Sequence, residues 1–119
     1  MNVRLERLRE EIKREVTDII RRFKDPRLGF VTVTDVELSR DLEHARIFVS
    51  AMGDAAERKQ TFAVLQAASG HVRSELAKRI RMRHVPEIVF AQDESIERGL
   101  RIDRLLRELS ARENPEVLK

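Results

Sequence analysis

The chain has no cysteine, tryptophan or tyrosine, and its 119 residues include only five phenylalanines, four glycines and three prolines. The lack of cysteine excludes disulfides, thiolate metal sites and thiol nucleophiles, and it agrees with a reducing compartment. No apolar run approaches the roughly 20 residues that a helix needs to cross a bilayer. The first 24 residues alternate charged and apolar groups, unlike a signal peptide. We therefore expect a cytoplasmic location.

The common signatures of catalysis are also missing. There is no glycine-rich loop ending in Lys-Ser or Lys-Thr, no Gly-x-Ser-x-Gly elbow and no Gly-x-Gly-x-x-Gly turn. His44, His71 and His84 lack the paired spacing of a metal-binding helix. We predict no catalytic residue, no cofactor and no metal site, and hence no enzyme. A hydrolase that uses Asp93, Glu94 or His84 remains an alternative, although acids at this place are expected to cap a helix.

Charge is distributed unevenly along the chain. The net charge is only +3, from 24 Lys and Arg against 21 Asp and Glu. Residues 1–24 hold eight cations and five anions, whereas residues 71–84 hold five cations and the single acid Glu75. We call residues 71–84 the basic segment; its cations are Arg73, Lys78, Arg79, Arg81 and Arg83. Such clustering is typical of a surface that meets phosphates.

The N-terminal half reads as a helix followed by a β-hairpin. The length suits one domain, and apolar residues at three- and four-residue spacing predict a helix that ends near Lys24, before Pro26. β-Branched residues predict a strand over 30–38 with a bulge between Val33 and Val36. Alternation over 44–50 predicts a second strand, antiparallel to the first.

The C-terminal half reads as a broken helix, a strand and a last helix. Asp54 is placed to cap a helix from Ala55 to about residue 80, and Gly70 predicts a sharp kink that divides it in two. A third strand should cover 86–92, with Pro86 at its first position. Apolar spacing predicts a final helix over about 96–109, and the domain should end near residue 110, with a charged tail over 111–119.

The kinked helices carry two different faces. Phe62, Leu65, Val72, Leu76 and Ile80 form an apolar face on the helical wheel. Nearly opposite lies a stripe without bulk, which we call the small-residue face: Ala63, Ala67, Gly70, Ser74 and Ala77. Lys59, Lys78 and Arg81 border it, so that another backbone could approach while cations reach its phosphates. Alternatively, the small residues admit a neighbouring helix and the cations are only solvated.

Stacking of bases on exposed rings is not expected. Phe23, Phe30, Phe48, Phe62 and Phe90 mostly lie where the core should take them, and only Phe48 faces away from the buried side of its strand. The chain therefore lacks the aromatic platform of RNA-recognition motifs and OB folds.

Several motifs together resemble the ribosome-binding factor A family, over about residues 3–110. The most specific is Asp25-Pro26-Arg27-Leu28-Gly29 followed by the string from Val31 to Leu42. Ala68-Ser69-Gly70 matches the Ala-x-Gly kink of that family, and a third stretch runs from Pro86 to Ile102.

The resemblance implies an α+β fold: a type II KH domain with the order helix, strand, strand, helix, kink, helix, strand, a three-stranded sheet with helices on one face, and a further C-terminal helix. It implies an assembly factor that binds the immature small ribosomal subunit and its RNA late in maturation, including that of the five-prime end, and leaves before translation. Growth at low temperature depends on this family. The resemblance also suggests assembly GTPases as further partners. No membrane partner is expected, and the chain is expected to be a monomer off the ribosome.

We expect the RNA to meet the basic segment, the kink and the first helix. The predicted RNA-binding residues are Arg4, Arg7, Ala68, Ser69, Gly70, Arg73, Lys78, Arg79, Arg81 and Arg83. Ordinary KH domains clamp four nucleotides with a Gly-x-x-Gly loop, which is replaced here by Ala68-Ser69-Gly70. The other hypothesis is an adaptor that binds a protein through the small-residue face, with the basic segment serving solubility.

Overall fold

A computed structural model of the chain describes residues 3–94 and 105–109. The first element, α1, covers Val3–Arg21 and buries Ile12, Val16, Ile19 and Ile20. Its end lies three residues before the predicted Lys24, and the amides of Arg22 and Phe23 still bond back to α1 carbonyls at 3.1–3.2 Å. The predicted turn follows, closed by the Leu28 amide on the Asp25 carbonyl at 3.0 Å.

Three strands form one sheet in the order β1-β2-β3. Strand β1 (Val31–Leu38) pairs antiparallel with β2 (His44–Ala51), and their register shifts between Val33 and Asp35, which confirms the predicted bulge. Strand β3 (Glu87–Gln92) runs parallel to β2 at the other edge. Since parallel neighbours need a crossover, the two intervening helices supply it.

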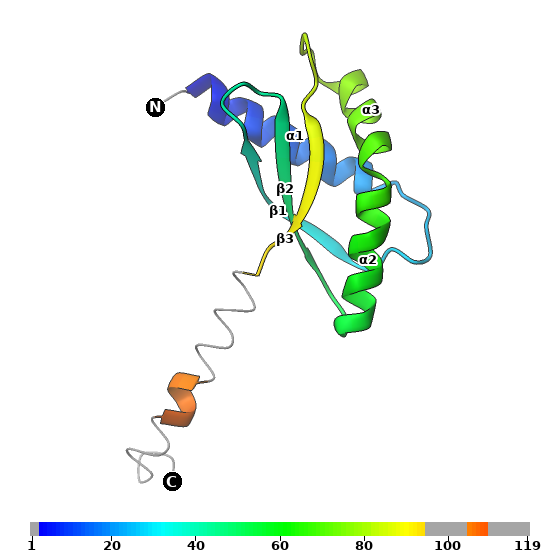
Figure 1. The fold of residues 1–119 in the computed structure, drawn as a ribbon, viewed down its shortest axis with the longest axis vertical. Helices are drawn as coiled ribbons and strands as arrows, with labels where there is room; N and C mark the ends of the chain where they lie inside the picture. Colours follow the sequence, from blue (N-terminus) through cyan, green and yellow to red (C-terminus); the bar gives the residue numbers. More distant parts are fainter. Residues whose placement is uncertain (1–2, 95–104, 110–119) are drawn as a thin grey trace.

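The crossover consists of α2 (Ala55–Ala67) and α3 (Ser69–Arg79), which Figure 1 shows as one bent column. Asp54 caps α2 as predicted, in a reciprocal capping box with Glu57. The break lies at Ala68, not at Gly70: Ala68 has φ −90° and ψ 0°, whereas Gly70 is helical within the first turn of α3. The Ser69 hydroxyl donates to the Gln66 carbonyl and so satisfies one acceptor at the end of α2.

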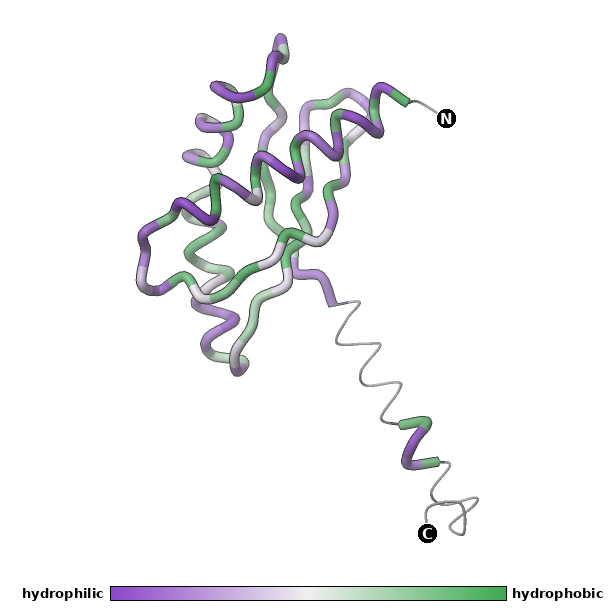
Figure 2. The backbone as a smooth tube through the Cα atoms, turned by 180° about the vertical axis from the view of Figure 1, so that it is seen from behind, coloured by the Kyte–Doolittle hydropathy of each residue, from purple (hydrophilic) through white to green (hydrophobic). Residues whose placement is uncertain are grey.

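All three helices lie on one face of the sheet (Figures 1 and 2). The core between the layers includes Val16, Ile47, Leu65, Leu76 and Phe90, each no more than 1% exposed. The predicted apolar face of α2 and α3 is thus confirmed, with Phe62 half-buried at its margin. This is the two-layer α+β arrangement of a type II KH domain, in the order expected from the sequence.

The expected last helix is only partly described. Residues 105–109 are helical, and Leu105, Leu106 and Leu109 are about half exposed; the rest of that expected helix and the tail over 111–119 lie outside the described residues. Within the described ranges, no helix is long and apolar enough to span a membrane.

Candidate nucleic-acid interface

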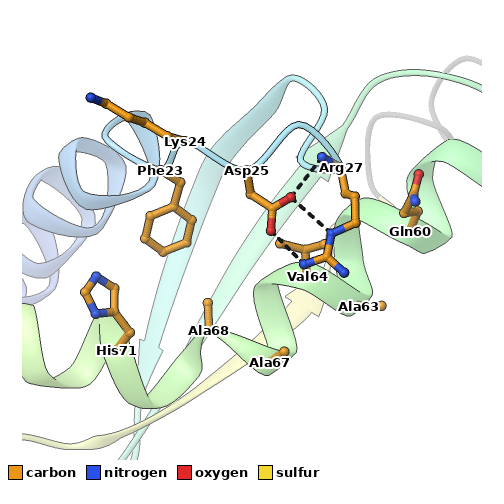
Figure 3. A pocket seen from close by; sticks show the side chains of 10 residues that line it. All are labelled: Phe23, Lys24, Asp25, Arg27, Gln60, Ala63, Val64, Ala67, Ala68 and His71. Atoms are coloured by element: carbon orange, nitrogen blue, oxygen red, sulfur yellow. Dashed lines mark hydrogen bonds and ion pairs between the residues drawn. The ribbon is translucent and has the colours of Figure 1, made fainter.

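The small-residue face is open. All five of its residues are exposed, so no other element of the described chain covers them. Two of them, Ala63 and Ala67, line a groove of about 450 Å³ between α2 and the loop that follows α1. We call it the kink groove, and it is lined by Phe23, Lys24, Asp25, Arg27, Gln60, Ala63, Val64, Ala67, Ala68 and His71 (Figure 3).

The loop wall of the kink groove is held by hydrogen bonds of the Asp25–Gly29 turn. The Asp25 carboxylate accepts from the Arg27 backbone amide, Nε and Nη2, at 2.9, 3.1 and 2.8 Å. These bonds, with the guanidinium charge, hold the pKa of Asp25 below its ordinary value. Asp25 therefore stays ionised at neutral pH and fixes Arg27 over the groove.

Gly29 attaches this turn to α2. Its amide donates to the hydroxyl of Thr61 at 3.1 Å, and Thr61 is 1% exposed. A Cβ at Gly29 would also lie 3.1 Å from that hydroxyl, closer than most side-chain contacts. A larger residue at Gly29 would force the Thr61 hydroxyl to shift by a few tenths of an ångström, so glycine favours the close approach of the turn to α2.

One end of the kink groove is closed by two rings. The centroids of Phe23 and His71 are 5.7 Å apart, with planes inclined by 47°, and Figure 3 shows the pair beside the methyl group of Ala68. Phe23 is half-buried and His71 exposed. The groove thus combines an apolar floor with the cations Lys24 and Arg27.

The cations of the basic segment divide into two groups. Lys78, Arg81 and Arg83 are exposed, and Lys78 forms an ion pair with Glu75 along α3, at 3.2 Å and with 71% of the side chain accessible. Such exposed pairs exchange easily with solvent or with a phosphate. These three cations are accessible to a partner, and their RNA contacts stay predictions.

Arg73 and Arg79 are already engaged by the protein. Arg73 donates twice to the Val85 carbonyl, at 3.0 and 3.2 Å, and so holds the chain that enters β3. Arg79 donates to Asp18 at 2.7 Å and Glu15 at 3.3 Å, with only 22% of its side chain accessible. To contact a phosphate, either residue must give up these partners, so their predicted RNA contacts stay predictions.

The predicted kink residues lie at the surface beside the groove. A Cβ on Gly70 would meet nothing within 4 Å, and its φ is not in the left-handed region. The fold itself therefore gives no reason for glycine here, and the backbone of Gly70 is open to an approaching partner. Ser69 is half-buried, and its hydroxyl already bonds to α2.

The first turns of α1 present Arg4 and Arg7. Both residues are exposed, as their predicted role in RNA binding requires. They lie on a different helix from the cations of the basic segment, so any contact that they make would extend the interface beyond α3.

The phenylalanines are less deeply buried than the sequence suggests. Phe90 is 1% exposed within the core, and Phe23 and Phe62 pack against the core while half-buried. Phe48 is also half-buried, whereas Phe30 is 72% exposed and departs from the expected burial. Phe30 lies between the turn and β1, just before the first paired residue of the sheet.

One of the acids considered for other chemistry, Asp93, has a structural partner. Asp93 accepts a hydrogen bond from the Thr34 hydroxyl at 2.6 Å, which ties the end of β3 to β1 across β2. Among the described residues, no three His, Asp or Glu side chains come together as a metal site.

Sequence reasoning did not find the kink groove, because its walls are more than 30 residues apart. Phe23, Lys24, Arg27, Gln60 and His71 were not among the predicted site residues, and only the fold brings them together. One local feature of the sequence pointed to this groove: Arg27 is a cation two residues after the acid Asp25, in a turn that ends at Gly29.

Comparisons with known proteins identify one family. The model described as "Ribosome-binding factor A" matches residues 4–106. A curated protein of that name from Desulforamulus reducens is 49% identical over 114 residues, which cover 95% of this chain and 95% of the relative.

Solved structures of the same family match the fold. The crystal structure of ribosome-binding factor A from Thermus thermophilus has a TM-score of 0.69 at 29% identity, covering 76% of this chain and 96% of that one. A homology model of the Thermus thermophilus factor, fitted into a cryo-EM map of its complex with the 30S subunit, has a TM-score of 0.62 at 29% identity and covers 72% and 91% of the two chains.

Proposed function

The chain belongs to the ribosome-binding factor A family, and we propose that it binds the immature small ribosomal subunit through the RNA. The observation that carries the proposal is the open small-residue face, which starts in the kink groove with Ala63 and Ala67 and continues along α3 to Ala77, next to the exposed Lys78. A helix surface without bulk lets a sugar–phosphate backbone come close, and the bordering Lys and Arg then meet its phosphates. The Thermus relative in its complex with the 30S subunit supports the choice of partner.

The proposed contacts follow from exposure. Lys78, Arg81 and Arg83 hold phosphates at one end of the helix column, and Ala68, Ser69 and Gly70 form the place of closest approach. Arg4 and Arg7 add contacts from α1. Arg73 and Arg79 either join them by exchanging partners or hold α3 in position beneath them.

Phosphate contacts also suit a factor that must leave. Their strength comes largely from counterion release, so binding is reversible without deep burial. We therefore propose a non-catalytic cytoplasmic factor, a monomer off the ribosome, that promotes late maturation of the small-subunit RNA, including its five-prime end, and dissociates before translation. Assembly GTPases are proposed as further partners, and growth in the cold as the condition that most needs the protein.

The central test is charge reversal on the loop after α3. Arg81→Glu with Arg83→Glu should weaken binding to purified immature small subunits by more than about tenfold, because two phosphate contacts become repulsive. The thermal midpoint should hardly change, since both side chains are exposed. Affinity is measured by co-sedimentation with the subunits.

The matched control reverses two exposed arginines of the hairpin, Arg40→Glu with Arg46→Glu, and so makes the same change in net charge. This pair should keep most of the affinity. If both double variants lose affinity equally, the effect is one of net charge, and the assigned surface is wrong. Full binding by the Arg81 and Arg83 variant would favour the protein adaptor instead.

A further inference from the structure

We propose that the kink groove is a receptor for one unstacked nucleotide, with the base on the apolar floor and the phosphate between Lys24 and Arg27. The inference rests on the proposed function and makes it more specific, because it assigns the RNA a base contact in addition to phosphate contacts. It places ribonucleotide recognition on residues 23–27 and 60–71, outside the cations of the basic segment.

The groove has the size of a ligand site. Its volume of about 450 Å³ lies within the roughly 300–1,000 Å³ of pockets that bind small molecules. Contacts with phosphates alone would not require a cavity of this volume. The side chains along α2 are small here, and Ala63, Ala67 and Ala68 leave the space open.

The floor offers flat apolar contact. Phe23 points from the start of the loop toward His71, the methyl group of Ala68 lies beside the pair, and that of Ala67 lies farther along α2 (Figure 3). Nucleobases that leave a stack bind against aromatic and apolar side chains, because every base has a π face. Gln60 adds an amide that can both donate and accept, as the edges of bases require.

The rim supplies the complementary charge. Asp25 is paired with Arg27, and the exposed Lys24 leaves the loop with a net positive charge; the Lys24 side chain points away from the groove in Figure 3 and turns inward to reach a phosphate there. The Asp25 carboxylate accepts hydrogen bonds from Nε and Nη2 of Arg27. Within residues 3–94 and 105–109, no hydrogen bond uses Nη1 of Arg27. An arginine held in this way is preorganised for an anion, since little side-chain entropy is left to lose.

The loop wall is rigid enough to act as a receptor before RNA arrives. The turn is closed by the Leu28 amide on the Asp25 carbonyl and attached to α2 through Gly29 and Thr61. The same Ala68 belongs to the groove and to the closest approach at the kink. A strand held along the small-residue face can therefore place one base in the groove.

The first test uses free nucleotides. The full chain, labelled with ¹⁵N, is titrated with AMP, GMP, CMP and UMP, and with ribose 5-phosphate, which has no base. We expect amide shifts in residues 23–29 and 60–71 with at least one nucleotide, and clearly smaller shifts with ribose 5-phosphate. Equal shifts with all five compounds, or none in these residues, would overturn the base site.

The second test fills the groove. Ala67→Leu puts a larger side chain at an exposed helical position, and Ala56→Leu makes the same exchange at an exposed position in the first turn of α2, outside the groove. Ala67→Leu should abolish the nucleotide shifts and weaken binding to immature subunits about tenfold, in the range of one lost stacking contact. Ala56→Leu should change neither. Lys24→Gln is a second variant at an exposed site, and it should weaken nucleotide binding severalfold.

The outcomes separate the two proposals. If the unmodified chain binds immature subunits but shows no nucleotide shifts in the groove, the base site is wrong and the proposed function stands. Because Ala67 also belongs to the small-residue face, a loss of subunit binding in Ala67→Leu counts for the base site only together with the loss of those shifts. If the unmodified chain does not bind these subunits, the proposed function fails, and the inference that rests on it fails too. Equal loss in Ala67→Leu and Ala56→Leu would also overturn the assignment to the groove.

Discussion

At the scale of one residue, Gly70 is a glycine that the fold does not require. It is helical, exposed, and surrounded by space that a methyl group could occupy. Glycine in a helix costs stability relative to alanine, because the unfolded chain has more freedom to lose. Gly29, by contrast, lies where a Cβ would be 3.1 Å from the Thr61 hydroxyl, so that the fold itself favours a glycine there.

The exchange Gly70→Ala therefore has opposite expected effects on stability and binding. It should raise the free energy of unfolding by about 0.5–1 kcal/mol, and it should weaken binding to immature small subunits severalfold, because the new methyl group holds the RNA backbone away. Urea unfolding and subunit co-sedimentation measure the two effects. A more stable variant that binds as before would remove Gly70 from the interface.

At the scale of elements, α1 and α3 are joined by charge as well as by apolar packing. Arg79 of α3 donates to Asp18 and Glu15 of α1, and these bonds raise the pKa of Arg79 and lower that of Asp18. The pair is therefore ionised at neutral pH. Because Asp18 has a depressed pKa in the folded chain, its contribution to stability is present above its ordinary pKa and is lost as the pH falls through the folded value.

Arg79→Ala should lower the thermal midpoint by a few degrees at pH 7, because Glu15 loses the cation that it shares with Asp18, and Asp18, among the described residues, keeps only the more exposed Arg22. Lys78→Ala is the matched control: this lysine is exposed and, among the residues that the structure describes, pairs within α3 with Glu75, so little change is expected. Repeating both melts at a pH below the depressed folded pKa of Asp18 should shrink the effect of Arg79→Ala, since a protonated Asp18 no longer needs the cation. An effect as large in acid as at neutral pH would show that packing, not the ion pairs, is lost.

At the scale of the whole molecule, recognition depends on where the charge lies more than on its sum. A net charge of +3 on 119 residues is small, and part of the positive charge is engaged inside the molecule by α1 and by the Val85 carbonyl. Exposed cations of the helix layer lie on the loop wall of the kink groove, at the end of α3, in the loop after it and in the first turns of α1.

The dependence of affinity on salt concentration measures how many phosphate contacts the protein makes with the RNA. If all five cations of the basic segment neutralise phosphates, log affinity should fall against log salt with a slope of roughly −3.5 to −4.5. Replacing Arg81 and Arg83 with Gln should make the slope shallower by roughly 1.4–1.8, at about 0.7–0.9 per contact. Replacing Arg73 and Arg79 with Gln tests whether these two exchange partners, because an unchanged slope would mean that they stay bound to the protein. A salt-independent complex would contradict the whole electrostatic mechanism.

The elements, their order and the division of the helices into faces were determined by the sequence itself. Periodicity, the Asp54 cap and the β-branched run act over a few residues, so they can be read locally, and even the bulge near Val33 was predictable. The place of the helix break was missed by two residues, because a glycine is tolerated in the first turn of a helix, and Ala68 carries no local signal.

The tertiary structure alone decided which cations are available and where a ligand can enter. Arg79 and Arg81 are two residues apart in one basic run, yet the first is tied to α1 and the second is exposed. The kink groove joins residues 23–27 to residues 60–71, and its rings and cations have no common pattern in the sequence. The physical reason is that ion pairs and hollows depend on distances between distant segments, which only the packing of α1 and its loop against α2 and α3 sets.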